Sequence, residues 1–311
     1  MLAKLRSYFG LIKEATNDFI DDNAIKLSAS LAYYTIFSIG PLLLVIITIM
    51  SFFYQKTNVT EQVFNQLSTL IGSTGAIQLK SILDNVSSLS NTTLFGIIGA
   101  VILIFGATGI FTEIQGSINY IWSVKAKPKK SWLKYITDRL LSFSLIVGIG
   151  FLLLVSLFIN LLLDLLTSHL QKYLGDVNVL LVKGFNLAVL FSIVTFLFAI
   201  IYKVLPDAKI FWKDAIVGAG WTGMFFLAGK FLISYYIGSS AITNTFGAAA
   251  SIIILLSWVY YSALILYFGA EFTKVYAMKM GKGITVYDTA VYIIKREAKE
   301  LPQLKHPVQE H

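Results

Sequence analysis

The stretch from Thr245 to Tyr276 constrains the fold more than any other part of the chain. It is apolar up to its first charged residue, Glu271, and it exceeds the about 20 residues that cross the hydrocarbon core of a bilayer as a helix. A helix satisfies its own backbone hydrogen bonds and is therefore one of only two structures that can span a membrane. Only 14% of the chain is charged, against about 25% in an average soluble domain. We therefore expect a membrane protein, in which Glu271 needs a polar partner.

Further apolar stretches predict an all-α membrane protein with six transmembrane helices in a domain covering residues 24–276. The expected spans are about 27–54, 93–114, 136–163, 179–202, 215–237 and 246–275. Gly40 and Pro41 lie inside the first span, and because proline removes a backbone donor they predict a kink there, which is either a hinge or bent packing. The polar outer segment 55–92 has apolar residues at helical spacing, which predicts short amphipathic helices.

The two ends of the chain are predicted to lie outside the hydrocarbon. Residues 1–23 form an amphipathic helix, which either lies in the membrane interface or packs on a neighbouring loop, and Asp21, Asp22 and Asn23 are expected to cap the next helix. Residues 277–311 form a tail, for which we expect a short helix and then a disordered end broken by Pro302 and Pro307.

The basic residues indicate the orientation. The expected outer loops hold only Lys56, Lys80 and Lys172, whereas the N-terminal segment, the links between spans two and three and between spans four and five, and the tail hold most of the remaining lysines and arginines. Because cytoplasmic loops are enriched in such residues, both termini are predicted to be cytoplasmic. The net charge of +8 is then explained by topology, and no nucleic-acid partner is expected.

Ionisable residues within spans are costly and usually face protein or water. Glu113 and Glu271 arrive at similar depth near the inner ends of their spans, where they either line a polar path or form ion pairs with Arg139, Lys203 or Lys274. In the outer half, Lys183 and Lys230 either bind an anionic group or pair with Asp164. Tyr260 lies near the middle of the last span, where its buried hydroxyl lines a polar path or bonds to a neighbouring helix.

The sequence lacks the signatures of an enzyme. It has no cysteine and three histidines, one in an outer loop and two in the tail, so no His-rich or Cys-based metal centre can be assembled. Phosphate loops, zincin helices and nucleophile elbows are also missing. We therefore expect no enzymatic activity, no cofactor and no bound metal.

Several motifs resemble those of one known family. They are the run from Ala29 to Pro41 (ASLAYYTIFSIGP), the segment from Gly116 to Trp122 (GSINYIW), Leu205-Pro206-Asp207, the segment from Ser257 to Ser262 (SWVYYS) and Gly269-Ala270-Glu271. In this order, and over nearly the whole chain, they resemble the BrkB/YihY family of bacterial inner-membrane proteins. The resemblance implies a six-span helical protein. It also carries a ribonuclease BN label that implies a tRNA-processing nuclease, but this chain offers no cluster of metal ligands for one.

Three functions follow as hypotheses. The first is a non-enzymatic membrane protein that moves or accommodates a solute or lipid, with Glu113, Asn119, Lys230, Tyr260 and Glu271 along its polar interior. The second is a structural or assembly factor of the envelope, which binds protein partners through residues 55–92 and the tail. The third is the nuclease. Membrane lipids are expected partners in every case, and a homo-oligomer is compatible with the sequence.

Overall fold

The computed structural model describes residues 2–51, 61, 64–65, 68, 76–77, 80, 108–127, 132–134, 136–138, 140–142, 144–146, 148, 177–239 and 250–295. These residues are mostly helical, as the apolar runs predict. The helices are α1 (Leu2–Asp21), α2 (Ala24–Ser51), α7 (Val177–Val204), α8 (Trp212–Ser239) and α10 (Ala250–Lys279), and residues 108–121 are helical as well. Most of the outer segment 55–92, the first part of span 93–114 and much of span 136–163 lie outside the described residues.

Two helical segments within the described part of the chain are long and apolar enough to cross a membrane. They are Leu187–Val204 of α7 and Ile253–Lys279 of α10, and Ala24–Ile39 of α2 is a shorter apolar helix. The number of spans therefore stays a prediction. Helix α2 continues through Gly40 and Pro41, so the expected hinge also stays a prediction.

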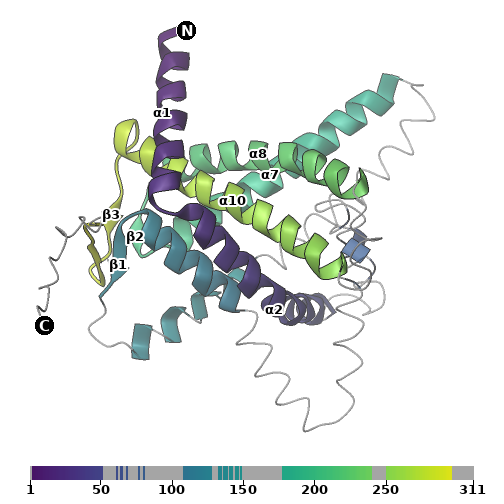
Figure 1. Ribbon diagram of the computed structural model, residues 1–311, viewed down its shortest axis with the longest axis horizontal. Helices are drawn as coiled ribbons and strands as arrows, with labels where there is room; N and C mark the ends of the chain where they lie inside the picture. The colour runs from purple at the N-terminus through teal and green to yellow at the C-terminus, as the bar shows by residue number, and fades with distance from the viewer. Residues whose placement is uncertain are drawn as a thin grey trace, which may run out of the picture.

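Helix α10 is the centre of the bundle. It packs against α1, α2 and α8, and α8 also packs against α7 (Figure 1). Tyr202 ties three of these helices together, because its hydroxyl donates to the Leu266 carbonyl of α10 at 2.8 Å and lies 3.1 Å from the Thr222 hydroxyl of α8. Gly269 lies under this junction, where a Cβ would come within 1.9 Å of Thr222 Oγ1. Such close approach of backbones is the packing that small residues permit in membrane helices.

Four short strands gather at the end of the molecule where α10 ends (Figure 1). Strand β1 (Val124–Ala126) pairs antiparallel with β4 (Ala290–Tyr292), and β2 (Ala208–Lys209) pairs antiparallel with β3 (Thr285–Val286). The expected helix at the start of the tail is therefore wrong, because residues 285–286 and 290–292 form β3 and β4. The strands satisfy the backbone groups of two interhelical links, and they place Ile284 and Ala290 in the core.

The helices also extend beyond the predicted spans at this end. Helix 108–121 continues past residue 114, and α10 continues past residue 275 to Lys279. Span prediction stops where polar residues begin, but a helix continues where those residues find protein partners. Here Asn119 and Lys279 both do so.

Candidate functional site

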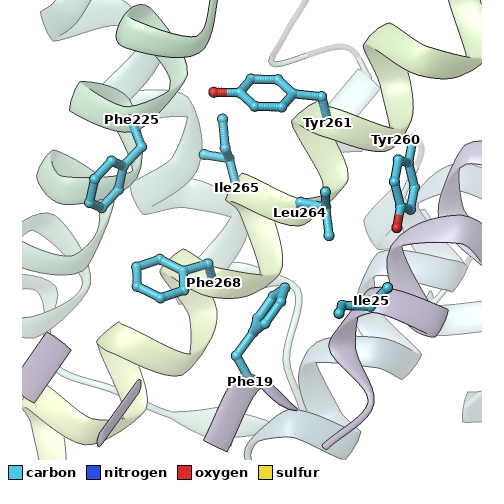
Figure 2. Close-up of a pocket in the computed structure, with 8 residues that line it drawn as sticks. All are labelled: Phe19, Ile25, Phe225, Tyr260, Tyr261, Leu264, Ile265 and Phe268. Atoms are coloured by element: carbon cyan, nitrogen blue, oxygen red, sulfur yellow. The ribbon is translucent and has the colours of Figure 1, made fainter. Parts of the chain in front are cut away.

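An open apolar groove of about 470 Å³ lies between α1, α2, α8 and α10 (Figure 2). Its lining is Phe19, Ile25, Phe225, Tyr260, Tyr261, Leu264, Ile265 and Phe268. The ring of Phe268 meets Phe19 edge to face at 5.9 Å between centroids, and it meets Phe225 at 5.6 Å. The two tyrosine hydroxyls are the polar side-chain groups of a lining that is otherwise hydrocarbon. This volume lies within the about 300–1,000 Å³ of small-molecule pockets, and the lining favours an apolar occupant.

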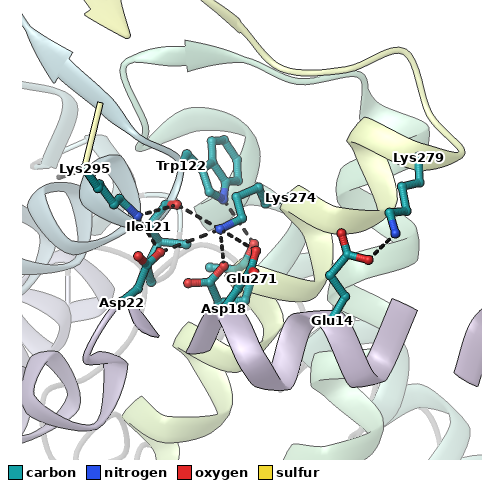
Figure 3. Close-up of polar contacts among 10 residues, drawn as sticks. Glu14, Asp18, Asp22, Ile121, Trp122, Glu271, Lys274, Lys279 and Lys295 are labelled. Carbon is teal, nitrogen blue, oxygen red and sulfur yellow. Dashed lines mark hydrogen bonds and ion pairs between the residues drawn. The ribbon is translucent and has the colours of Figure 1, made fainter. Parts of the chain in front are cut away.

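An ionic cluster lies beside the groove, one turn further along α10 (Figure 3). It consists of Asp18, Asp22, Glu271, Lys274 and Lys295. The ammonium of Lys274 is central, with oxygens of Glu271 at 2.6 Å, Asp18 at 2.9 Å and Asp22 at 3.6 Å. The cluster therefore joins α1, the turn before α2, α10 and the tail.

The tail enters the cluster through Lys295. Its ammonium pairs with Asp22 and donates to the Ile121 carbonyl at 3.2 Å. Burial lowers the pKa of Lys295 and the nearby charge of Lys274 adds to this, whereas Asp22 and Glu271 oppose the shift. Lys274 donates to the same carbonyl at 3.3 Å, so the end of helix 108–121 contributes an oxygen that binds both lysines.

A second polar contact connects the link after α7 to helix 108–121. The side chain of Asn119 donates to Asp207 Oδ2 at 2.8 Å and accepts from the Asp207 backbone N–H at 2.8 Å. Lys134 pairs with Asp207 and, at 2.7 Å, with Asp138. Burial acts to lower the pKa of Lys134, but the hydrogen bonds to these two carboxylates and their charges outweigh it and raise that pKa.

The residues singled out from the sequence lie in several places and not around one polar cavity. Glu271 contacts Lys274, while Glu113 accepts a hydrogen bond from Ser30 at 2.6 Å. Asn119 is bound to Asp207, and Tyr260 lines the apolar groove. Lys230 is a half-buried residue of α8.

The structure describes only some of the residues that were expected to form ion pairs. Lys203, near the end of α7, donates to the backbone carbonyl of Ile210 in the link between α7 and α8. Arg139 and Asp164 lie outside the described residues, and the side chain of Lys183 does too, so those pairings stay predictions.

Sequence reasoning missed Asp18, Asp22 and Lys295. Asp22 was expected to cap α2, but it is buried and contacts two lysines instead. The available signal was the four-residue spacing of Asp18 and Asp22, which share a side where a helix is continuous, although α1 ends at Asp21 and Asp22 lies in the turn that follows. Nothing in the sequence indicated that Lys295, far along the tail, returns to meet them.

These features define a class: a helical membrane protein with an open apolar groove and a buried ionic cluster where its segments converge. Residues 15–286 match the family model described as virulence factor BrkB, and the chain belongs to this family.

Its relatives are named only as membrane proteins. A UPF0761 membrane protein of Tolumonas auensis is 29% identical, over 81% of this chain and 80% of its own. Similar proteins of the same name occur in Aeromonas salmonicida (29% identical, 82% of this chain and 84% of the relative) and Haemophilus influenzae (27% identical, 81% and 90%). No solved structure matches the chain. The family resemblance expected from the sequence is thus confirmed, and the comparisons name no activity.

Proposed function

We propose that this chain is a multi-pass protein of the bacterial cytoplasmic membrane that accommodates a lipid acyl chain in its apolar groove. It acts as a non-enzymatic, transporter-like protein. The proposed topology has six spans with both termini in the cytoplasm, and the proposed partners are membrane lipids.

The lining of the groove carries this proposal. Leu264, Ile265 and Phe268 belong to Ile253–Lys279 of α10, a segment that is long and apolar enough to cross a membrane, and in the proposed topology lipid is the solvent around it. A hydrocarbon-lined depression there is filled by lipid tails, because water would find no hydrogen-bonding partners. A polar solute would need convergent polar groups, and within the described lining these are only the two tyrosine hydroxyls.

The strand pairings support the proposed topology independently of the charge distribution. Segments that pair must lie on the same side of a membrane, so the chain crosses an even number of times between β1 and β4 and between β2 and β3. The six-span arrangement meets both conditions. The ionic cluster adds a third condition, because it brings Asp22 of the N-terminal region to Lys295 of the tail.

Photolabelling of the groove tests the proposal. The protein is reconstituted into nanodiscs that contain a phospholipid with a photoactivatable acyl chain, and the labelled residues are mapped by mass spectrometry. We expect labels enriched at residues 260–268 relative to the exposed face around Leu232, because a lipid tail held in a groove stays longer than one sliding past an open surface.

A matched pair of variants provides the control. Leu264→Trp fills the groove, whereas Leu232→Trp makes the same change on α8 at a side chain that is 67% exposed. Groove labelling should fall in the first variant and stay unchanged in the second. Equal labelling of both regions in the unmodified chain, with no effect of Leu264→Trp, would refute the proposed lipid site.

The transporter-like part requires a separate measurement. Vesicles containing a fluorescent phospholipid should show movement of that lipid between leaflets that depends on the protein and is lost in the Leu264→Trp variant. If vesicles with protein behave as protein-free vesicles do, the groove holds lipid without moving it, and the transporter-like role is rejected.

A further inference from the structure

The ionic cluster carries an imbalance of charge. It holds three carboxylates, Asp18, Asp22 and Glu271, but two ammonium groups, Lys274 and Lys295. If every group were ionised, one negative charge would remain in excess. The Ile121 carbonyl adds a further electronegative oxygen, so the backbone contributed by helix 108–121 does not offset the excess.

Glu271 is the least satisfied of the three carboxyls. Its side chain is 0% exposed, and Oε1 has no hydrogen-bond partner within the described residues. The Lys274 ammonium, 2.6 Å from Oε2, is the ion-pair partner of Glu271 within the described residues. Oε1 has no ion-pair contact either. This unpartnered buried oxygen is an observation separate from the count of charges.

The surrounding elements supply no other charge to Glu271. On α1, Asp21 is exposed, and Glu14 pairs with Lys279 at an exposed position. On helix 108–121, Glu113 is held by Ser30 of α2, and the nearby Trp122 donates to the Ala270 carbonyl at 3.1 Å and not to the carboxyl. The Thr273 hydroxyl donates to the Gly269 carbonyl of its own helix. Asp18, Asp22, Lys274 and Lys295 are thus the charged groups that face it within the described residues.

An ionised carboxylate that is fully buried with one ion-pair partner, and that lies beside other carboxylates, is costly, and binding a proton removes that cost. We propose that Glu271 is an exchangeable proton-binding site, and that its occupancy controls how tightly the end of α1 is held against α10. With the proton bound, the two remaining carboxylates balance the two lysines.

The direction of the response follows from these contacts. When Glu271 loses its proton, Lys274, only three residues away on α10, is drawn to it and shares less of its charge with Asp18 and Asp22. The excess negative charge then repels both of these residues. Raising the pH therefore releases the end of α1.

This movement also reaches the groove. Phe19 follows Asp18 on α1 and contacts Phe268, which lies one turn before Glu271. Release of α1 would separate these two rings and open the end of the groove nearest the cluster. Only this last step rests on the proposed function, since the proton site and the release of α1 do not require a lipid.

Electron-spin distance measurements test the release. The chain has no cysteine, so Asn17→Cys and Met278→Cys give a clean pair of labels at exposed positions on α1 and α10. Nanodiscs are measured from pH 5 to pH 9 without added lipid ligand. We expect a narrow distance distribution at low pH. As the pH rises, a second population at a longer distance should appear, and the ratio of this population to the first should grow by up to about tenfold per pH unit, the slope of one linked proton.

Two substitutions distinguish the proton site from a general effect of pH. Glu271→Gln mimics the protonated side chain and should keep the narrow distribution at every pH. Glu14→Gln removes another contact between α1 and α10 and should retain the pH response. A response that persists in Glu271→Gln, or that is missing from the unmodified chain, overturns the proposal.

Infrared spectroscopy gives a direct readout that does not depend on movement. The unmodified protein should show the carbonyl band of a protonated carboxylic acid, which is absent in Glu271→Gln and present in Glu14→Gln; no such difference would refute the assignment. Exchanging sodium for choline at fixed pH should leave the distances unchanged. Closure of α1 by sodium alone would identify a metal cation as the neutralising ligand and would also overturn the proton site.

Discussion

The Gly218→Ala substitution tests the close approach of α8 to α10 that positions both the groove and the ionic cluster. A Cβ at Gly218 would lie 1.8 Å from Thr273 Oγ1, 2.8 Å from its Cβ and 3.1 Å from its Cα. Rotation about χ1 moves the hydroxyl of Thr273 but neither carbon, so the helices must separate. Overpacking of this kind costs about 1–3 kcal/mol. The gain of about 1 kcal/mol for alanine over glycine in a helix offsets part of it, which leaves a net loss of up to about 2 kcal/mol.

Gly220→Ala is the matched control. It lies on the same helix, and a Cβ there would meet no heavy atom within 4 Å. Because both variants gain the same helical preference, the difference between their stabilities isolates the cost of packing, about 1–3 kcal/mol.

Thermal unfolding in detergent, with size-exclusion chromatography as the readout of the folded fraction, measures this difference in stability. A change of 1 kcal/mol shifts Tm by about 2–4 °C for chains of 150–250 residues, so Gly218→Ala should melt several degrees below Gly220→Ala. Combining Gly218→Ala with Thr273→Ala should recover part of the loss, because the hydroxyl contact is then removed. If Gly218→Ala melts as high as Gly220→Ala, α8 and α10 do not approach as closely as described.

Three more predictions concern the end of the molecule where the strands gather. Asn119→Ala leaves the buried Asp207 N–H unpaired and should cost about 1–3 kcal/mol, seen as a lower Tm; an unchanged Tm would contradict the pairing. The pKa of Lys134 is raised in the folded state, so its stabilising ion pairs are present below the unfolded pKa of about 10.4 and are lost as pH rises through the folded value. Tm should therefore fall at high pH, and Lys134→Gln should reduce that fall. Cysteines at Lys125 and Val291, which are register partners in β1 and β4, should form a disulfide when an oxidant is added, and when reduced they should react with a membrane-impermeant thiol reagent only from the cytoplasmic side.

Most of the helices could be predicted from the sequence because they correspond to long apolar runs, whereas α1 was predicted from its amphipathic pattern. The runs predicted at 179–202 and 215–237 lie inside α7 and α8, which extend a few residues further at both ends. Glu271 could also be singled out, because a carboxylate at the end of an apolar run must find a partner or a proton. Lys274 was one of three candidate partners, with Arg139 and Lys203, and the structure shows that Lys274 contacts Glu271.

The strands and the ionic cluster could not be predicted in this way. Two- and three-residue strands have no periodic signal of their own, and β1 pairs with β4 across about half the length of the chain. The Asp22–Lys295 pair joins residues that are even further apart in sequence. Local patterns identify which side chains are polar, but only the packing of α1 and the tail against α10 determines which of them meet.

The contact between α1 and α10 changes character along its length, and this determines how α1 can move. Leu11 and Ala15 are buried against Phe272, Val275 and Tyr276 in a small apolar cluster. Burial of a leucine side chain contributes about 1.5–3 kcal/mol, and this contribution does not depend on pH. The following turn is held by charges that respond to a proton. A change of protonation therefore pivots the end of α1 about a fixed apolar anchor, and it displaces Phe19 while the middle of the helix stays in place.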